Sequence, residues 1–124
     1  MQVSKRYLFS AAHRILHHKG KCKNLHGHNY LATFIISSTT LTNHMVLDYS
    51  DFKKYKDFLD TYFDHALLID EEDEEMIRIA KKLQTKYFVL KKTTCEEISI
   101  FLKLQFPELS QVNIQESETT QCLN

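Results

Sequence analysis

The sequence predicts an α+β domain in which an antiparallel β-sheet carries its helices on one face. Two observations support this class: segments with apolar residues at every second position, and segments with apolar residues at helical spacing. Their order along the chain is strand, strand, helix, helix, short strand, helix, strand. The 124 residues include only two glycines and one proline, so long loops and linkers are not expected. We therefore expect a single domain that spans residues 1–124.

Two strands are expected in the first third of the chain. Residues Gln2 to Ala12 alternate apolar and polar side chains, and Asn29 to Ser37 do the same with larger apolar residues. The polar stretch His17 to Leu25 lies between them and contains Gly20, so it is expected to form a loop. Pairing of the two strands would bring together the residues on either side of this loop.

Two helices are expected in the middle of the chain. Ser50 can cap a helix that runs to about Tyr62, and apolar side chains at helical spacing mark its buried face. The acidic run Asp70–Glu75 opens a second helix that continues through Lys82. Early acidic residues and late lysines stabilise a helix through its dipole. The acidic run itself is interpreted as a solvated helix start.

The last third is expected to contain a short strand, a helix and a final strand. Lys86 to Leu90 is apolar enough for the short strand. Thr94 and Glu97 form a capping box at the start of a helix with a regular apolar face. Gln111 to Glu116 alternates apolar and polar residues again, which predicts the final strand.

Composition excludes several function classes. Sixteen basic and sixteen acidic residues cancel, so no overall field attracts nucleic acid or a membrane surface. No apolar run approaches the ~18 residues of a membrane span, and the N-terminal residues lack the apolar core of a signal peptide. Three cysteines are too few, and an odd number, for a disulfide framework. The sequence thus predicts a cytoplasmic protein without a nucleic-acid or membrane partner.

Three histidines and one cysteine form the most informative pattern in the chain. His26 and His28 are two residues apart, so on a strand both imidazoles leave the same face. Pairing of the first two strands would bring His13 beside them. Three neutral imidazoles without a fourth protein ligand make a zinc site with an open coordination position, which is the arrangement that catalysis requires.

Cys22 has three interpretations, and its spacing from the histidines does not choose among them. It could be a fourth zinc ligand, which would close the site and make it structural. It could be a thiolate base beside the metal, which the positive charge of nearby lysines favours. It could also be a plain buried thiol. The lysines in question are Lys19, Lys21 and Lys23.

These residues resemble the zinc motif of the 6-pyruvoyl-tetrahydropterin synthase superfamily. The motif is Ala-Ala-His, here ending at His13, followed by Cys-x-x-x-His-Gly-His from Cys22 to His28 and then an aromatic residue. The three-residue gap after the cysteine resembles the bacterial branch, the 6-carboxy-tetrahydropterin synthases of queuosine and 7-deazaguanine biosynthesis. Further blocks follow in the family's order at Met45–Tyr49, Phe63–Leu68, Thr94–Glu96 and Val112–Glu116.

The resemblance implies a fold, a cofactor and a reaction. The fold is the tunnelling fold (T-fold), in which the sheets of several subunits join into a barrel, here as a homohexamer built from two trimers. The cofactor is Zn²⁺, held by His13, His26 and His28. The reaction is that of a lyase on a small pterin, 7,8-dihydroneopterin triphosphate. Its products are 6-carboxy-5,6,7,8-tetrahydropterin, triphosphate and acetaldehyde.

The resemblance also assigns catalytic roles. Cys22 becomes a general base or proton shuttle, and Asp64 with His65 becomes a proton-relay pair. Without the family, a polar pair at this position also suits the end of a helix. Because Glu116 and the Asp64–His65 pair both lie far along the chain from the zinc motif, we expect one or both of them to reach it from a neighbouring subunit.

Glu116 and Thr94 are the residues expected to bind the substrate ring. Glu116 matches a family glutamate, and a carboxylate can accept two parallel hydrogen bonds from the edge of a pterin. Glu118 is a competitor that faces the same way, two residues further on. Thr94 resembles a threonine that helps to hold the ring, and a helix cap accounts for it equally well.

Two other functions remain open on the sequence. The first is a 6-pyruvoyl-tetrahydropterin synthase with the same site and substrate, although its cysteine-to-histidine gap is usually longer. The second is a non-catalytic zinc protein in which Cys22 joins the three histidines. Two departures from the family are visible: the stretch Ile69–Lys92 is long and charged, and the closing strand after Glu116 is short or absent. No triphosphate-binding motif is evident, and the candidates are Arg14, Lys19, Lys21 and Lys23.

Overall fold

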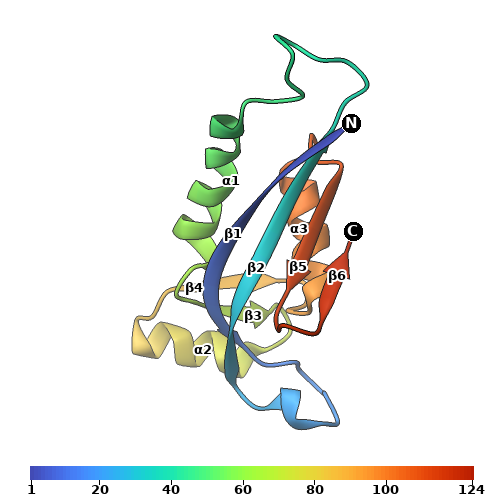
Figure 1. The fold of residues 1–124 in the computed structure, drawn as a ribbon. Helices are drawn as coiled ribbons and strands as arrows, with labels where there is room; N and C mark the ends of the chain where they lie inside the picture. Colours follow the sequence, from blue (N-terminus) through green and yellow to red (C-terminus); the bar gives the residue numbers. More distant parts are fainter.

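The computed structural model describes residues 1–124 and shows one six-stranded sheet flanked by helices (Figure 1). The strands lie in the order β4-β3-β1-β2-β5-β6. The α+β class predicted from the sequence is confirmed. None of the helices is both long enough and apolar enough to cross a membrane. The strands are β1 (Gln2–His13), β2 (His26–Ser37), β3 (Ala66–Asp70), β4 (Tyr87–Leu90), β5 (Gln111–Gln115) and β6 (Gln121–Leu123).

The sheet is mixed, whereas an antiparallel sheet was expected. The pairs β1–β2, β2–β5 and β5–β6 are antiparallel, but β1–β3 and β3–β4 are parallel. The difference comes from β3, which the sequence analysis did not predict. Its five residues, Ala66–Asp70, form a short run without alternation, as expected for a strand buried on both faces. A parallel neighbour then requires a crossover, and a helix supplies it.

The first helical segment is less regular than expected. A 3₁₀ turn, η2 (Tyr49–Phe52), leads into α1 (Lys53–Phe58), and a π-helical turn, η3 (Leu59–Phe63), follows. The predicted cap was wrong, because Asp48 caps the segment and its Oδ1 accepts from the Ser50 backbone N–H at 2.8 Å. The chain leaves the helical conformation at Asp64.

The second helix, α2 (Glu74–Leu83), begins later than expected, and its acidic start is not uniformly solvated. Asp70 belongs to β3, and Asp73 is the residue whose side chain caps α2 by accepting from the Met76 N–H at 3.2 Å. Both aspartates are only 3% exposed. Lys92 pairs with Asp70 at 3.1 Å, and Arg14 pairs with Asp73 at 2.7 Å. Burial is tolerated because each carboxylate has a cationic partner.

The third helix, α3 (Cys95–Gln105), begins where the sequence predicts. The Thr94 side chain accepts from the Glu97 N–H at 3.4 Å, which confirms the cap. Helices α1 and α3 pack against one face of the sheet, where aromatic residues dominate the core. Helix α2 packs on the opposite face of β3, because Ile69 contacts α2 while Leu68 faces the main core. The helices therefore cover both faces at this edge.

Side chains that face α1 and α3 alternate along β1 and β2. Phe9 and Ala11 on β1 and Tyr30 and Ala32 on β2 are buried in this core. Phe9 stacks on Tyr30 with ring centroids 4.9 Å apart. The same alternation continues to the ends of both strands, so the next inward-facing positions are occupied by histidines.

Replacing Asp73 with asparagine should lower the free energy of unfolding and make it less dependent on pH in the acidic range. The hydrogen bonds from Arg14 lower the pKa of Asp73, so their stabilising effect is complete above the unfolded carboxyl pKa of about 3.9. It is lost as the pH falls through the lower pKa of the folded state. We expect Asp73→Asn to lose about 1–3 kcal/mol at pH 7, measured by urea denaturation, and the difference from wild type to shrink towards pH 3.

Asparagine can still cap α2, so this substitution removes mainly the charge. Glu75→Gln is the matched control, because Glu75 is an exposed partner 3.6 Å from the same guanidinium. It should change stability by less than about 0.5 kcal/mol. Equal pH profiles for wild type and Asp73→Asn would contradict the assigned role of the ion pair.

Candidate metal centre and active site

The antiparallel pairing of β1 and β2 brings the three histidines together at one end of the sheet. His13 is the last residue of β1 and lies opposite His26, the first residue of β2, while His28 lies opposite Ala11. One ring nitrogen from each histidine can be chosen so that all three lie within 4.8 Å of one another. The ring centroids are 4.7, 4.9 and 5.3 Å apart. These three residues could therefore hold a metal ion.

Hydrogen bonds assign the tautomer of two of the histidines. The Nδ1 atom of His13 lies 2.8 Å from the Thr93 carbonyl, and the Nδ1 atom of His26 lies 2.7 Å from the Asn24 carbonyl. A carbonyl only accepts, so each Nδ1 carries the proton. The Nε2 lone pair of each ring is then available for a metal. Backbone carbonyls of this kind commonly orient metal-binding histidines.

The third histidine provides the strongest test of whether a metal fits. The Nε2 atom of His28 is buried and has no hydrogen-bond partner within the chain. Leaving a buried polar atom without a partner costs about 1–3 kcal/mol, and a metal would satisfy it. His13 is 2% exposed, and burial lowers its pKa, which favours the neutral form that binds metals. The donor set therefore fits a metal ion.

The residues behind His13 were not identified from the sequence. The Thr93 hydroxyl donates to the Arg14 carbonyl at 3.1 Å, and the Arg14 guanidinium donates two hydrogen bonds to Asp73. Thr93 is thus held in place while its own carbonyl orients His13. The only local signal was its position next to the helix cap Thr94. The connection depends on contacts between residues about 80 positions apart.

A cavity of about 260 Å³ opens beside the metal-binding histidines. Cys22, on the 3₁₀ turn η1 (Lys21–Lys23), lines it together with His13 and His26. The three-histidine group does not include Cys22. The fold thus places Cys22 in the same cavity as His13 and His26 but outside the three-histidine group. The side of the group that faces this cavity carries no fourth ligand from the group.

The expected ring-binding residues line the same cavity. Glu116 follows β5 directly, and its carboxylate accepts a hydrogen bond from the Cys95 thiol at 3.4 Å. Thr94 lines the cavity as well as capping α3. Glu118 is exposed in the turn before β6 and does not line the cavity, which favours Glu116 over it. Cys95 and Cys122 also line it, so all three cysteines of the chain meet there.

Asp64 and His65 lie on the other face of the sheet. The Ser10 N–H donates to Asp64 at 2.9 Å, and this hydrogen bond lowers the pKa of Asp64, with a further contribution from His65. His65 Nδ1 lies 2.8 Å from Asp64, and the His65 side chain is 81% exposed. His65 lines a second cavity with Ser10, Asn29 and the candidate ligand His28, and this cavity shares no lining residue with the cavity of Cys22. A single chain therefore does not bring the pair to Cys22.

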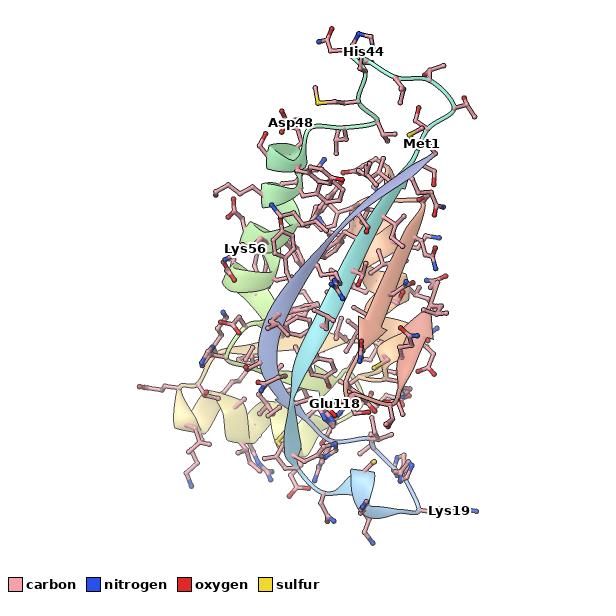
Figure 2. All side chains as sticks on the ribbon, viewed as in Figure 1. Met1, Lys19, His44, Asp48, Lys56 and Glu118 are labelled. Carbon is pink, nitrogen blue, oxygen red and sulfur yellow. The ribbon has the colours of Figure 1, made fainter.

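The basic candidates for a triphosphate site are also distributed unevenly. Arg14 is committed to the carboxylate of Asp73. The three lysines of the loop form no ion pair, and Figure 2 shows Lys19 at the tip of this loop. The structure gathers none of them around the three histidines.

Comparison with known proteins agrees with this fold. A model of the 6-pyruvoyl tetrahydropterin synthase family matches residues 2–123. The chain therefore belongs to this family, and it is an enzyme of the tetrahydropterin synthase class. The branch within the family is indicated by relatives in which nearly the whole length is shared.

A 6-carboxy-5,6,7,8-tetrahydropterin synthase from Haemophilus influenzae is 38% identical, with 98% of this chain and 96% of the relative covered. One from Rickettsia bellii is 32% identical with the same coverage. Among solved structures, an uncharacterised protein from Wolinella succinogenes superposes with a TM-score of 0.86 at 20% identity, covering 100% and 97% of the two chains. The 6-pyruvoyl tetrahydropterin synthase of Caenorhabditis elegans gives 0.71 at 25% identity, covering 100% and 94%. The tunnelling fold is thereby confirmed.

Substitution of a candidate ligand should abolish metal binding. We expect the purified protein to hold about one divalent metal ion per chain, because three imidazoles converge. His26→Ala should retain far less metal by inductively coupled plasma mass spectrometry. His44→Asn is the matched control, since His44 is exposed at the far end of the molecule from Lys19 (Figure 2). Equal metal content in His26→Ala and wild type would contradict the site.

Proposed function

We propose that the protein is a zinc-dependent 6-carboxy-5,6,7,8-tetrahydropterin synthase of queuosine and 7-deazaguanine biosynthesis. It would convert 7,8-dihydroneopterin triphosphate into 6-carboxytetrahydropterin, acetaldehyde and triphosphate, and so act as a carbon–oxygen and carbon–carbon lyase. The observation that carries the proposal is the three-histidine group, of which His13 and His26 line a cavity together with Cys22 and Glu116. Relatives that bear this name at 38% and 32% identity support the choice of branch.

Zinc is the proposed metal, because three imidazoles with no thiolate among them form the donor set of open catalytic zinc sites. When bound by His13, His26 and His28, it supplies Lewis-acid stabilisation of negative charge that develops on the substrate side chain. The hydrogen bonds that His13 and His26 donate through Nδ1 to the Thr93 and Asn24 carbonyls keep these two rings oriented.

Cys22 is proposed to move the protons of the substrate side chain. It lies on the loop that joins the two metal-binding strands, and it is half-buried at the edge of the cavity. A thiolate here can remove a proton from a side-chain carbon and return one later. This role requires a sulfur that stays off the metal, which agrees with its exclusion from the three-histidine group.

Asp64 and His65 are proposed as the second proton-transfer pair. The lowered pKa of Asp64 keeps its carboxylate ionised, and the carboxylate accepts from His65 Nδ1. This leaves His65 Nε2 free to accept or donate a proton. His65 adopts a left-handed backbone conformation, with φ at 57°, while its N–H donates to the Ser10 carbonyl at 2.6 Å. The His65 imidazole is therefore exposed to solvent, while its backbone is held by the hydrogen bond to Ser10.

Glu116 and Thr94 are proposed to hold the pterin ring. The 2-amino group and the adjacent ring N–H of a pterin offer two parallel donors, and a carboxylate accepts both. A carboxylate at the edge of a cavity gains most from such a partner because it is partly removed from water. Thr94 lies at the same end of the cavity, next to Cys95.

Product analysis tests the proposed reaction. The zinc-loaded protein is incubated with 7,8-dihydroneopterin triphosphate, and the pterins and acetaldehyde are quantified by liquid chromatography and mass spectrometry. We expect 6-carboxytetrahydropterin and acetaldehyde in equal amounts. A three-carbon 6-pyruvoyl product would identify the sister activity instead. No turnover by the metal-loaded assembly would favour a non-catalytic zinc protein.

Cys22→Ala should separate catalysis from metal binding. If Cys22 acts as a base, the variant keeps its zinc and loses roughly 10²–10⁴-fold in turnover. Metal content and initial rates are measured on the same preparation. Cys122→Ala is the matched control, because Cys122 lines the same cavity without a hydrogen bond to any side chain. Loss of zinc from Cys22→Ala would instead make Cys22 a ligand of a closed site.

We further propose that the active site is shared between subunits of a homohexamer built from two trimers. Two features support this: His65 and Cys22 line separate cavities, and β4 and β6 leave open edges on the sheet. Open edges favour pairing with another chain. Joining such edges from several copies would close the barrel that gives the fold its name.

Subunit mixing tests this arrangement. His65→Ala and Cys22→Ala chains are each inactive, and the two are mixed under conditions that allow subunit exchange. Mixed assemblies contain some sites with both wild-type groups, so activity should return to roughly a quarter of the wild-type value if pairing is random. Each variant mixed with itself is the control. Verified exchange without recovery would place both groups on one chain, and a fully active monomer would refute the assembly.

A further inference from the structure

The carboxylate of Glu116 lies between two groups that compete for it. Its Oε2 atom accepts from the Cys95 thiol at 3.4 Å and lies 3.9 Å from Nε2 of His28. That Nε2 atom is the buried nitrogen without a partner. Glu116 Oε2 is therefore close both to its hydrogen-bond donor, the Cys95 thiol, and to the candidate metal ligand His28.

The distance to His28 is close to that between two ligands of one metal ion. In a tetrahedral zinc site with bond lengths of about 2.0–2.1 Å, neighbouring ligand atoms are about 3.4 Å apart. At 3.9 Å from His28, the Glu116 oxygen lies within the 4.8 Å that spans the three candidate histidine nitrogens, so a small shift would let it share their metal. The side chain of Glu116 is 33% exposed, and it has no hydrogen bond other than the one from Cys95. A small rotation would make it a fourth ligand.

Cys95 is well placed to prevent this rotation. It is the first residue of α3, whose start is capped by Thr94, and its side chain packs against the main core. Burial raises the pKa of the Cys95 thiol, and the nearby charge of Glu116 raises it further. The sulfur thus keeps its proton and remains a hydrogen-bond donor. Cys22, which lines the same cavity, has no such bond to a carboxylate.

We propose that Cys95 is a positioning residue whose thiol holds the Glu116 carboxylate away from the metal, so that the fourth coordination position stays open. The part of the inference that concerns substrate affinity rests on the proposed function, since Glu116 would bind the pterin ring from this position. The part that concerns metal coordination does not. Loss of the thiol donor would convert Glu116 from a ring-binding group into a metal ligand and close the site.

The test uses the cobalt-substituted protein without substrate. Co²⁺ replaces zinc in such sites, and its visible absorption reports the number and type of ligands. In Cys95→Ala we expect a changed spectrum and metal binding about tenfold tighter, because a carboxylate has joined the coordination sphere. Cys95→Ser keeps a donor at this position and should resemble wild type. Cys122→Ala controls for loss of a cysteine from the same cavity.

Two further variants keep the test decisive. Adding Glu116→Gln to Cys95→Ala should restore the wild-type spectrum, because the amide is a poor ligand. Cys95→Val fills the space of the thiol without donating a hydrogen bond. It should give the same spectrum and metal affinity as Cys95→Ala, and it serves as the test variant if the alanine variant folds poorly. In kinetic assays, Cys95→Ala should raise KM about five- to tenfold, as expected for loss of one hydrogen bond from a weak donor such as a thiol, and Cys95→Ser should reverse the increase.

The outcomes separate this inference from the proposed function. Unchanged spectra and affinities in both Cys95→Ala and Cys95→Val would overturn the positioning role, even if the wild type makes 6-carboxytetrahydropterin. The expected spectral change in a protein that does not act on the pterin would support the positioning role and refute the reaction. Equal behaviour of the serine and alanine variants would show that the hydrogen bond is not the cause.

Discussion

The antiparallel register between β1 and β2 is the constraint on which the rest of the molecule depends. The two strands pair along their whole length, from Gln2 opposite Ser37 to His13 opposite His26. Because side chains alternate between faces, a slip of one residue would turn every aromatic residue of one strand away from the core. The same slip would turn His26 and His28 away from His13. Core packing and the candidate metal site are thus set by a single register, so the energy of burying Phe9 and Tyr30 also positions the ligands.

The connection between β4 and α3 links the two ends of the candidate active site. Its residues and the first residue of α3 make contacts one after another: Lys92 pairs with Asp70, Thr93 orients His13, and Cys95 donates to Glu116. These contacts join the end of β3, the end of β1 and the residue that follows β5. A four-residue segment held at so many points loses little further entropy when a ligand binds. It also explains why buried acidic residues are retained at Asp70 and Asp73, since their ion pairs hold the segments on either side of this connection.

The position of Asp64 and His65 places the proposed proton-transfer pair outside the cavity of Cys22. The pair is held by the backbone of Ser10, whose neighbours Phe9 and Ala11 point into the core. His65 lines a cavity with Ser10 and Asn29, whose side chains point away from the core, and His28 borders the same cavity. A sheet of this shape can place both sets of groups in one site when a second copy brings its outer face to the cavity of the first. The open edges at β4 and β6 make such an arrangement physically reasonable.

Much of this architecture was predictable because it depends on local patterns. Alternation predicted β1, most of β2 and the shared face of the three histidines, and the capping box predicted the start of α3. The cavity that gathers Cys22, Thr94 and Glu116 agrees with the resemblance to the family. The strand alternation and the capping box depend on residues only two to four positions apart, and patterns at this spacing can be recognised directly in the sequence.

The tertiary structure alone decided the remainder. A short, mostly apolar run such as Ala66–Asp70 has no period, so only its parallel pairing with β1 and β4 shows it to be a strand. Asp73 resembles its exposed neighbours in sequence, and its burial depends on Arg14, which lies 59 residues away. The link from Thr93 to His13 likewise spans 80 residues. The sequence by itself determined which residues could serve as ligands and which faces they share. Contacts between distant residues decided how those ligands are oriented, because hydrogen bonds and burial depend on proximity in space.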